Sequence, residues 1–174
     1  MVVQQDLRAL IREIPDFPEP GILFRDITPL LADAAAFRRS LDWMEGLAAA
    51  RDATAVVAIE SRGFIFGAPL AERIGLALVP VRKEGKLPHA SHAEEYVLEY
   101  GTNTLEIHQD ALGPTDRVLI VDDLLATGGT ARAAVRLVEM TGASVTGLAF
   151  LVELTDLPGR GLLSNQQVDA LIAY

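Results

Sequence analysis

The chain has 174 residues, about the length of one folded domain, so a second independent catalytic domain is not expected. Half of the residues are hydrophobic and 22% are charged, a composition that can bury a sizeable core and excludes a disordered chain. Acidic residues outnumber basic ones by 24 to 15, and the formal charge of -9 argues against binding along a nucleic acid backbone.

The N-terminal segment, residues 1–32, is rich in proline and turn-forming residues, as in IPDFPEPGILFRDITPLL. We expect it to cover the core of the single domain, 1–174, as a hood that does not join the main sheet. A helix is predicted after it, over Phe37–Ala50.

Short apolar runs follow along the chain and predict strands that are buried on both faces. They are Ala55–Ile59, Leu76–Val81, Val118–Val121 and Val145–Leu151. Helices are predicted between them, at Phe64–Ile74 and from Thr130 to a stop at Gly142, because apolar residues recur there with helical spacing. This alternation predicts an α/β domain with a doubly wound, mostly parallel sheet and right-handed crossovers.

Residues 83–116 interrupt the alternation, because they are polar and too long for an ordinary connection. Connections of more than about 15 residues usually act as lids or binding loops. Within this segment, Tyr96–Tyr100 and Thr104–His108 are predicted to pair as a small ribbon around a turn at Gly101-Thr102-Asn103. We therefore expect a flexible lid loop over a site.

The cellular setting is indicated by what the sequence lacks. There is no cysteine, which excludes disulfides and thiolate metal sites and suits a reducing compartment. No segment approaches the roughly 20 apolar residues that span a bilayer, and the N-terminus lacks the apolar run of a signal peptide. A cytoplasmic protein without a membrane partner is the expectation.

The most informative segment is VLIVDDLLATGGTAR, residues 118–132, in which an apolar strand leads through two aspartates and a short loop into a helix. Glycines let the backbone approach an anion closely, and the unpaired N–H groups of the helix start point toward it. Asp122 and Asp123 can accept hydrogen bonds from vicinal sugar hydroxyls or meet a Mg²⁺ that carries phosphate oxygens. No lysine follows the second glycine, and the spacing is not G-x-G-x-x-G, so a nucleoside triphosphatase loop and a dinucleotide fingerprint are excluded. The implied ligand is a sugar phosphate.

With this segment the sequence resembles the type I phosphoribosyltransferases, and it is most similar to their adenine-specific branch. The matching blocks occur in the same order over nearly the whole chain: PDFPEPGILFRDITPLL, ESRGF, VRKEGKLP, LEYG with LEIH, and VDDLLATGGTA. The resemblance implies the type I phosphoribosyltransferase fold and a glycosyltransferase of purine salvage. Its substrates would be adenine and phosphoribosyl pyrophosphate, its products AMP and pyrophosphate. It also implies Mg²⁺ bound with the diphosphate substrate and a homodimer.

The resemblance also assigns roles to individual residues. The 5-phosphate loop corresponds to Ala126, Thr127, Gly128, Gly129 and Thr130, and the pair for the ribose and the metal-bearing diphosphate to Asp122 and Asp123. Contacts with the pyrophosphate correspond to Arg62, Arg82, Lys83, Lys86 and Tyr100, and contacts with adenine to Phe24, Arg25 and Leu154. Glu99 is implied as acid or base toward N7 of the purine, and Arg62 is the second residue implied in catalysis.

The residues themselves give independent support for two of these roles and leave others open. Arg62 follows a predicted strand, where ligands bind in open α/β sheets. Lys83 and Lys86 are cations in an acidic chain and can attract a polyanion, although a solvated basic loop would look the same. Phe24 offers an aromatic face to a purine but could equally pack in the core.

Two other functions remain open from the sequence. One is a phosphoribosyltransferase for another base, and Ala126 argues against it, because hypoxanthine-type relatives commonly carry a third acidic residue at this position. The other is a non-catalytic regulator that senses phosphoribosyl pyrophosphate and binds nucleic acid. The charge of -9 and the presence of Glu99 argue against that regulator.

Overall fold

The computed structural model describes residues 6–97 and 102–174, and the chain divides into two compact units, residues 1–43 and 44–174. The first unit contains a two-stranded antiparallel sheet, β1 (Arg12–Pro15) and β2 (Leu23–Asp26), followed by α2 (Thr28–Ala32). β1 and β2 form a sheet of their own, so the prediction that this segment stays out of the main sheet is confirmed. α3 (Ala34–Ala50) begins in the first unit and ends in the second.

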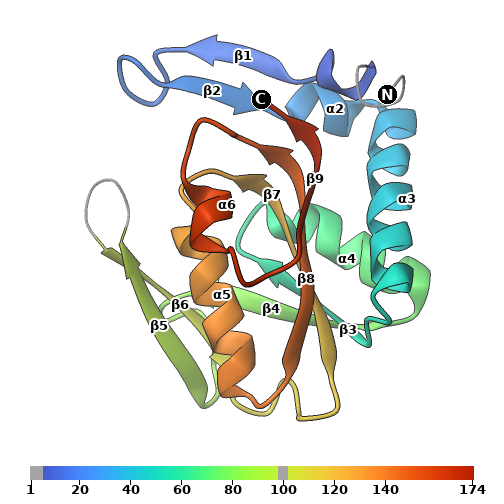
Figure 1. Ribbon diagram of the computed structural model, residues 1–174, viewed down its shortest axis with the longest axis vertical. Coiled ribbons are helices and arrows are strands. Elements are labelled where there is room, and N and C mark those ends of the chain that lie inside the picture. Colours follow the sequence, from blue (N-terminus) through green and yellow to red (C-terminus); the bar gives the residue numbers. More distant parts are fainter. Residues whose placement is uncertain (1–5, 98–101) are drawn as a thin grey trace. The chain divides into compact units, whose positions relative to one another are not determined.

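The second unit is built on a seven-stranded sheet with the order β5-β6-β4-β3-β7-β8-β9 (Figure 1). Its strands are β3 (Ala55–Ile59), β4 (Ala77–Lys83), β5 (Ser91–Val97), β6 (Thr102–His108), β7 (Arg117–Leu125), β8 (Ser144–Glu153) and β9 (Val168–Ala173). Five neighbouring strands, β4, β3, β7, β8 and β9, run parallel. In contrast, β6 is antiparallel to β4 and β5 is antiparallel to β6. The predicted mostly parallel α/β fold is therefore confirmed.

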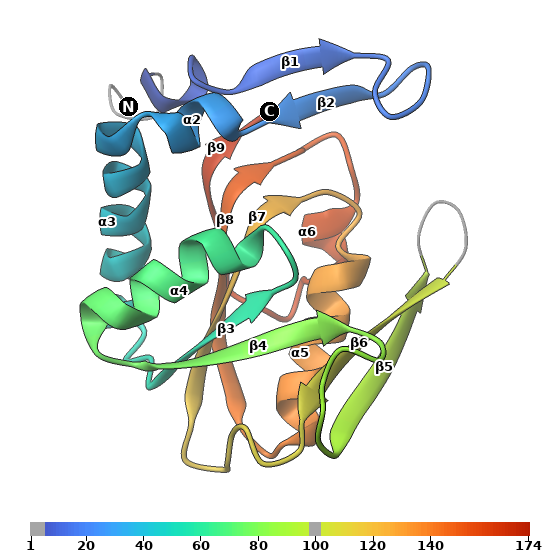
Figure 2. The ribbon, with the colours of Figure 1, turned by 180° about the vertical axis from the view of Figure 1, so that it is seen from behind.

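Helices cover both faces of this sheet. α4 (Gly63–Ile74) lies on one face, and α5 (Gly129–Met140) lies on the other with the short α6 (Gly159–Leu162) beside it (Figures 1 and 2). The core between them contains side chains that are fully excluded from solvent, including Val57, Ile59 and Ile120. Burying such aliphatic side chains stabilises the fold by about 1.5–3 kcal/mol each.

The segment predicted as a lid loop contains more regular structure than the sequence indicated. β5 begins at Ser91, five residues before the predicted ribbon, and β6 hydrogen-bonds to the end of β4 through Arg82 and Lys83. The physical reason is that Leu105 and Ile107 on β6 are buried in the core of this unit, which holds the hairpin to the sheet. An ion pair between Arg136 on α5 and Glu94 on β5 also holds it.

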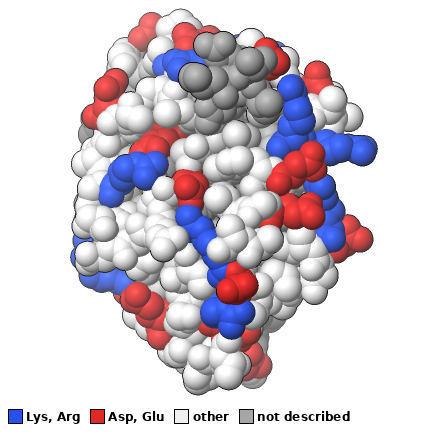
Figure 3. Space-filling model, turned by 45° about the vertical axis from the view of Figure 1, so that its right-hand side comes forward, with Lys and Arg blue, Asp and Glu red and all other residues white. Residues whose placement is uncertain are grey.

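The outer elements complete the second unit. Residues Val168–Ala173 form the edge strand β9, which pairs in parallel with β8. Among the described residues, no helix has both the length and the hydrophobicity needed to cross a membrane. On the face drawn in Figure 3, Lys and Arg side chains lie beside Asp and Glu side chains and form no broad basic area.

Candidate active site

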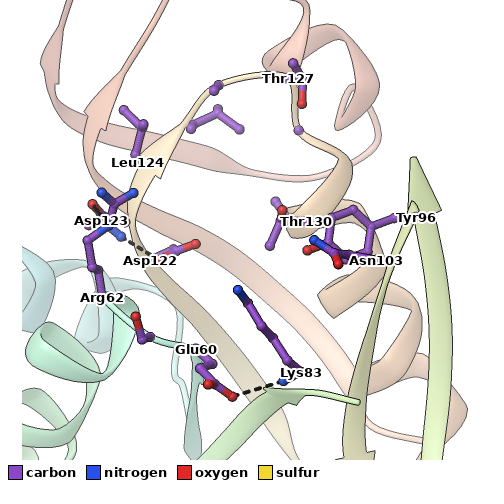
Figure 4. Close-up of a pocket in the computed structure, with 15 residues that line it drawn as sticks. Glu60, Arg62, Lys83, Tyr96, Asn103, Asp122, Asp123, Leu124, Thr127 and Thr130 are labelled. Atoms are coloured by element: carbon purple, nitrogen blue, oxygen red, sulfur yellow. Dashed lines mark hydrogen bonds and ion pairs between the residues drawn. The ribbon is translucent and has the colours of Figure 1, made fainter. Parts of the chain in front are cut away.

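A cavity of about 500 Å³ opens in the second unit where β3, β4 and β7 end (Figure 4). This is the carboxyl edge of the parallel strands, where open α/β sheets bind their ligands. Its lining comes from the end of β3, the end of β4, the β5–β6 hairpin, β7 and the start of α5: Glu60, Ser61, Arg62, Lys83, Tyr96, Asn103, Asp122, Asp123, Leu124, Leu125, Ala126, Thr127, Gly128, Thr130 and Ala131.

The loop between β7 and α5 forms one side of this cavity. Gly128 has a φ of +85°, a left-handed conformation that glycine adopts without steric strain. α5 starts at the next residue, and its first regular hydrogen bond runs from the Arg132 N–H to the Gly128 carbonyl oxygen at 2.9 Å. The preceding N–H groups therefore lack helical partners, and Thr130 and Ala131 line the cavity. The loop and helix start can bind an anion.

The two aspartates of β7 have different partners. Asp123 is only 4% exposed, and its Oδ2 lies 2.8 Å from Nε of Arg62. Burial raises the pKa of Asp123, while the charge of Arg62 acts in the opposite direction. Arg62 is brought to this position by the adjacent Gly63, where a Cβ would lie only 2.7 Å from the carbonyl oxygen of Val121 on β7.

Asp122 lies on the cavity side of the strand (Figure 4). Its Oδ1 accepts a hydrogen bond of 2.8 Å from the backbone N–H of Asp123. Burial, and then the negative charge of Asp123, raise the pKa of Asp122 well above its ordinary value. Without a ligand, this carboxylate is poorly compensated, so it suits hydroxyl donors or a cation supplied by a substrate.

A third carboxylate, Glu60, binds basic residues at and after the end of β4. Its side chain is 7% exposed and accepts hydrogen bonds from the backbone N–H of Lys83 at 3.0 Å and from Nε of Arg82 at 3.3 Å. It also forms an ion pair with the ammonium group of Lys86. Burial alone would raise the pKa of Glu60, but these donors together lower it. Glu60 is therefore an ionised anchor for this turn.

Lys83 differs from the other cations of the turn. Its side chain extends into the cavity (Figure 4), and within the described residues its ammonium group has no ion-pair partner. The predicted cationic group is thus divided, since Arg82 and Lys86 are held by Glu60 while Lys83 faces the space where an anion would bind.

The comparisons with known proteins agree with this geometry. Residues 30–164 match the phosphoribosyl transferase domain family. The adenine phosphoribosyltransferases of Synechococcus sp. and Carboxydothermus hydrogenoformans are 56% and 57% identical to the chain, and each alignment covers 97% of this chain and 99% of the relative.

The chain belongs to the phosphoribosyltransferase family. Among solved structures, the adenine phosphoribosyltransferase of Thermoanaerobacter pseudethanolicus is similar with a TM-score of 0.95 and 51% identity, covering 98% of this chain and 99% of that one. The Saccharomyces cerevisiae enzyme, solved with an imino-altritol bisphosphate and adenine, has a TM-score of 0.93 and 39% identity, covering 98% and 99%. The family and fold predicted from the sequence are confirmed.

Most of the predicted site residues of this phosphoribosyltransferase lie together. The predicted residues that line the cavity are Arg62, Lys83, Asp122, Asp123, Ala126, Thr127, Gly128 and Thr130. Gly129 is the first residue of α5. Leu154 lies behind the loop rather than in the cavity lining, and its backbone N–H donates to the carbonyl oxygen of Leu125 at 2.9 Å.

Four other predicted residues are not among those that line the cavity. Phe24 and Arg25 belong to the first unit, where the ring of Phe24 meets Phe17 edge-on at 5.2 Å and Arg25 pairs with Glu13. Their contact with a purine stays a prediction. Glu99 and Tyr100 lie outside the described residues, so their roles also stay predictions.

Sequence reasoning did not single out several residues that line the cavity. Glu60 and Ser61 directly precede Arg62 in the ESRGF block, and a carboxylate after a fully buried strand was the available signal. Tyr96 and Asn103 face each other across the β5–β6 hairpin. They were missed because the predicted ribbon began at Tyr96 and placed Asn103 in the turn instead of in β6.

The carboxylates of the cavity fit a metal ion only when a substrate supplies further ligands. Over residues 6–97 and 102–174, no group of three or more His, Cys, Asp or Glu side chains is arranged to hold a metal ion. The cavity nevertheless contains two adjacent carboxylates, one of them poorly compensated. Mg²⁺ in phosphate-transferring sites is commonly held by one or two carboxylates together with substrate phosphates. The residues present therefore fit a Mg²⁺ that arrives with a diphosphate.

Proposed function

We propose that this chain is an adenine phosphoribosyltransferase, which transfers ribose 5-phosphate from phosphoribosyl pyrophosphate to N9 of adenine and releases AMP and pyrophosphate. The observation that carries this proposal is the shared cavity of the β7 carboxylates, the loop before α5 and Lys83. These groups match the three parts of the donor, which are a pentose, a phosphate monoester and a diphosphate. The names of the similar relatives and structures support adenine as the acceptor.

The sugar phosphate is held from two sides in this proposal. The backbone N–H groups of the loop and helix start, with the hydroxyls of Thr127 and Thr130, bind the 5-phosphate. Asp122 accepts hydrogen bonds from the ribose hydroxyls, which add to the one donor that the described residues give it, the backbone N–H of Asp123. Fixing the pentose in this way orients C1 toward the incoming base and lowers the entropic part of the barrier.

The diphosphate is placed at the end of β4. Lys83 and Arg62 supply positive charge to it, with Arg82, Lys86 and Tyr100 as the further predicted contacts. Asp122 and Asp123 would hold a Mg²⁺ that arrives with the diphosphate, and the ion would supply positive charge toward the pyrophosphate. Positive charge develops on the ribose ring as the pyrophosphate departs, by analogy with glycoside cleavage. Stabilising both charges in a preorganised site is the main catalytic contribution of these residues.

The base and its proton depend on residues that are still predictions. Phe24 and Arg25 with Leu154 are proposed to hold adenine, the first through its aromatic face. Glu99 is proposed to exchange a proton with N7 of the purine as the bond to C1 forms. The enzyme is proposed to work in the cytoplasm, in keeping with a chain that contains no cysteine.

We also propose a homodimer. Ile65 on α4 and Leu78 on β4 are 39% and 41% exposed, which is high for large aliphatic side chains. These two elements pack against each other, so both side chains belong to one region of the second unit. The surface around these two side chains is the candidate contact with a second copy of the chain, and the oligomeric state in solution tests it.

Replacing Lys83 with alanine is expected to raise KM for phosphoribosyl pyrophosphate about 10–100-fold, because a charge-assisted contact contributes about 1.5–3 kcal/mol. Lys86→Ala is expected to have a smaller effect, since Glu60 already holds that ammonium group. Steady-state kinetics at saturating adenine measure both. Equal increases in KM for the two variants would contradict the division of the cations.

The function is tested by incubating the purified chain with phosphoribosyl pyrophosphate, Mg²⁺ and, separately, adenine, hypoxanthine, guanine, xanthine and orotate. Nucleotide and pyrophosphate are expected with adenine at a kcat/KM at least about 100-fold above that for any other base. A preference for hypoxanthine would overturn the acceptor but keep the reaction. Binding of phosphoribosyl pyrophosphate without turnover of any base would instead favour the non-catalytic sensor.

A further inference from the structure

The loop between β7 and α5 also packs against a residue that does not line the cavity. This residue is Gly159, the first residue of α6. A Cβ at Gly159 would lie 2.2 Å from the carbonyl oxygen of Ala126, and a Cβ at Gly128 would lie 2.8 Å from the carbonyl oxygen of Gly159. Both distances are shorter than side chains tolerate, so two glycine backbones are in direct contact here. The loop cannot move toward α6.

Gly159 is in turn fixed by the residue that follows it. The guanidinium of Arg160 binds the carboxylate of Glu153 through two parallel contacts, 2.7 Å from Nε to Oε1 and 2.5 Å from Nη2 to Oε2. A third contact of 2.9 Å runs from Nη1 to the carbonyl oxygen of Val168 on β9. Two-point binding of this kind fixes orientation as well as distance. α6 is therefore held to the ends of β8 and β9.

Glu153 connects this ion pair to the sheet. It is the last residue of β8 and is 5% exposed, so its charge depends on Arg160 for compensation. The next residue, Leu154, donates its N–H to the carbonyl oxygen of Leu125 at the start of the loop. The two ends of the loop are thus supported by one segment, 153–160, which lies behind it.

None of Glu153, Gly159 and Arg160 lines the cavity, so their effect on a ligand there must pass through the loop. We infer that Gly159, held by the Glu153–Arg160 ion pair, positions the phosphate loop from behind and so preorganises its N–H groups for the 5-phosphate. This inference rests on the proposed function of that loop. Preorganisation of this kind improves binding because fewer degrees of freedom are lost when the ligand arrives.

A matched pair of glycine substitutions tests this inference. Gly159 and Gly161 lie in the same short helix, neither has a positive φ, and a Cβ at Gly161 would have no atom within 4 Å. Gly159→Ala is expected to raise KM for phosphoribosyl pyrophosphate and Kd for ribose 5-phosphate about 10–100-fold, since small misplacements of a binding group have effects of this size. KM for adenine should change less than about threefold. Gly161→Ala should leave all three values and the unfolding temperature unchanged.

A second variant addresses the ion pair and decides the matter if Gly159→Ala does not fold. Arg160→Lys keeps the positive charge but loses the two-point geometry. It is expected to raise KM for phosphoribosyl pyrophosphate about 3–10-fold and to leave kcat and KM for adenine unchanged. Arg160→Met removes the charge as well and should raise KM for phosphoribosyl pyrophosphate more than Arg160→Lys does.

Three results would overturn the inference. Folded Gly159→Ala with the wild-type KM and Kd would do so, and so would Arg160→Lys with the wild-type KM for the donor. A uniform loss of stability and of every kinetic parameter would show that the contact is structural only. Failure of the wild-type chain to bind ribose 5-phosphate would instead remove the proposed function of the loop, so the two failures are distinguishable.

Discussion

Asp122→Asn is expected to raise the stability of the free protein while lowering kcat/KM for phosphoribosyl pyrophosphate about 100–1000-fold. Activity falls because an amide can neither meet Mg²⁺ as a charged ligand nor accept strong hydrogen bonds from the ribose. Stability rises because burial and the charge of Asp123 both disfavour the ionised form of Asp122. Removing about 1 kcal/mol of this penalty would raise the unfolding temperature by about 2–4 °C in a chain of this size.

The gain in stability should depend on pH in a defined direction. The pKa of Asp122 is raised in the folded state above its ordinary value of 3.8. Below that value both folded and unfolded chains carry a proton on this group, and the variant and wild type should be equally stable. As the pH rises above 3.8, the unfolded chain ionises first, so the wild type loses stability that the variant keeps. The difference in unfolding temperature should therefore grow as the pH rises from about 4 toward the raised pKa of Asp122 in the folded chain.

Thermal unfolding without substrate or Mg²⁺, followed across this pH range, measures that difference. Asp110→Asn, at an exposed position after β6, is the matched control and should change neither stability nor activity. A variant of Asp122 that is less stable than the wild type at pH 7 would contradict the raised pKa. One that keeps full activity would remove Asp122 from the ribose site.

Arg62→Ala is expected to reduce both activity and stability. The substitution leaves Asp123, which is 4% exposed, without the guanidinium at 2.8 Å. Breaking a fully buried pair costs about 3–5 kcal/mol, and we expect about 2–3 kcal/mol here because the Arg62 side chain is 43% exposed. KM for phosphoribosyl pyrophosphate should rise about 10–100-fold with the loss of a charged contact to the diphosphate.

A double variant separates the two effects of Arg62. In Arg62→Ala the pKa of Asp123 rises further, so its destabilisation should be largest at neutral pH and should disappear as the pH falls below about 4. Arg62→Ala combined with Asp123→Asn should recover most of the stability at pH 7, because the unpaired carboxylate is gone, but not the KM. Chemical denaturation and kinetics on the two single variants and the double variant measure this coupling. If the double variant recovers neither stability nor KM, loss of the Arg62–Asp123 ion pair is not the cause of the destabilisation in Arg62→Ala.

The contrast between Lys83 and Lys86 shows where sequence reasoning stops. Both lysines stand in the same basic stretch, and nothing in their order along the chain distinguishes them. In the structure, Glu60 reaches from the end of β3 and binds Lys86, Arg82 and the backbone of Lys83. The difference arises because β3 and β4 are neighbours in the sheet. Pairing between strands decides which cation remains for the ligand.

The hairpin β5–β6 gives a second example. A ribbon was predicted from two segments, Tyr96–Tyr100 and Thr104–His108, on either side of a turn. The sequence did not show that β6 pairs with β4 or that the ion pair Arg136–Glu94 holds β5 to α5. Tyr96 and Asn103 reach the cavity through these contacts. Register is a tertiary property when a hairpin is long, because several pairings satisfy the same alternation.

By itself, the sequence of this protein determined the alternation of core strands and helices from β3 to β8, the anion-binding start of α5 and the paired aspartates of β7. Those features depend on apolar periodicity, on glycine conformation and on neighbours within a few residues, all of which are local. Tertiary structure alone decided that Glu60 holds two of the cations and that Gly159 supports the loop from behind. These contacts join residues far apart in the chain, and they exist because parallel strands place their carboxyl ends at one edge of the sheet.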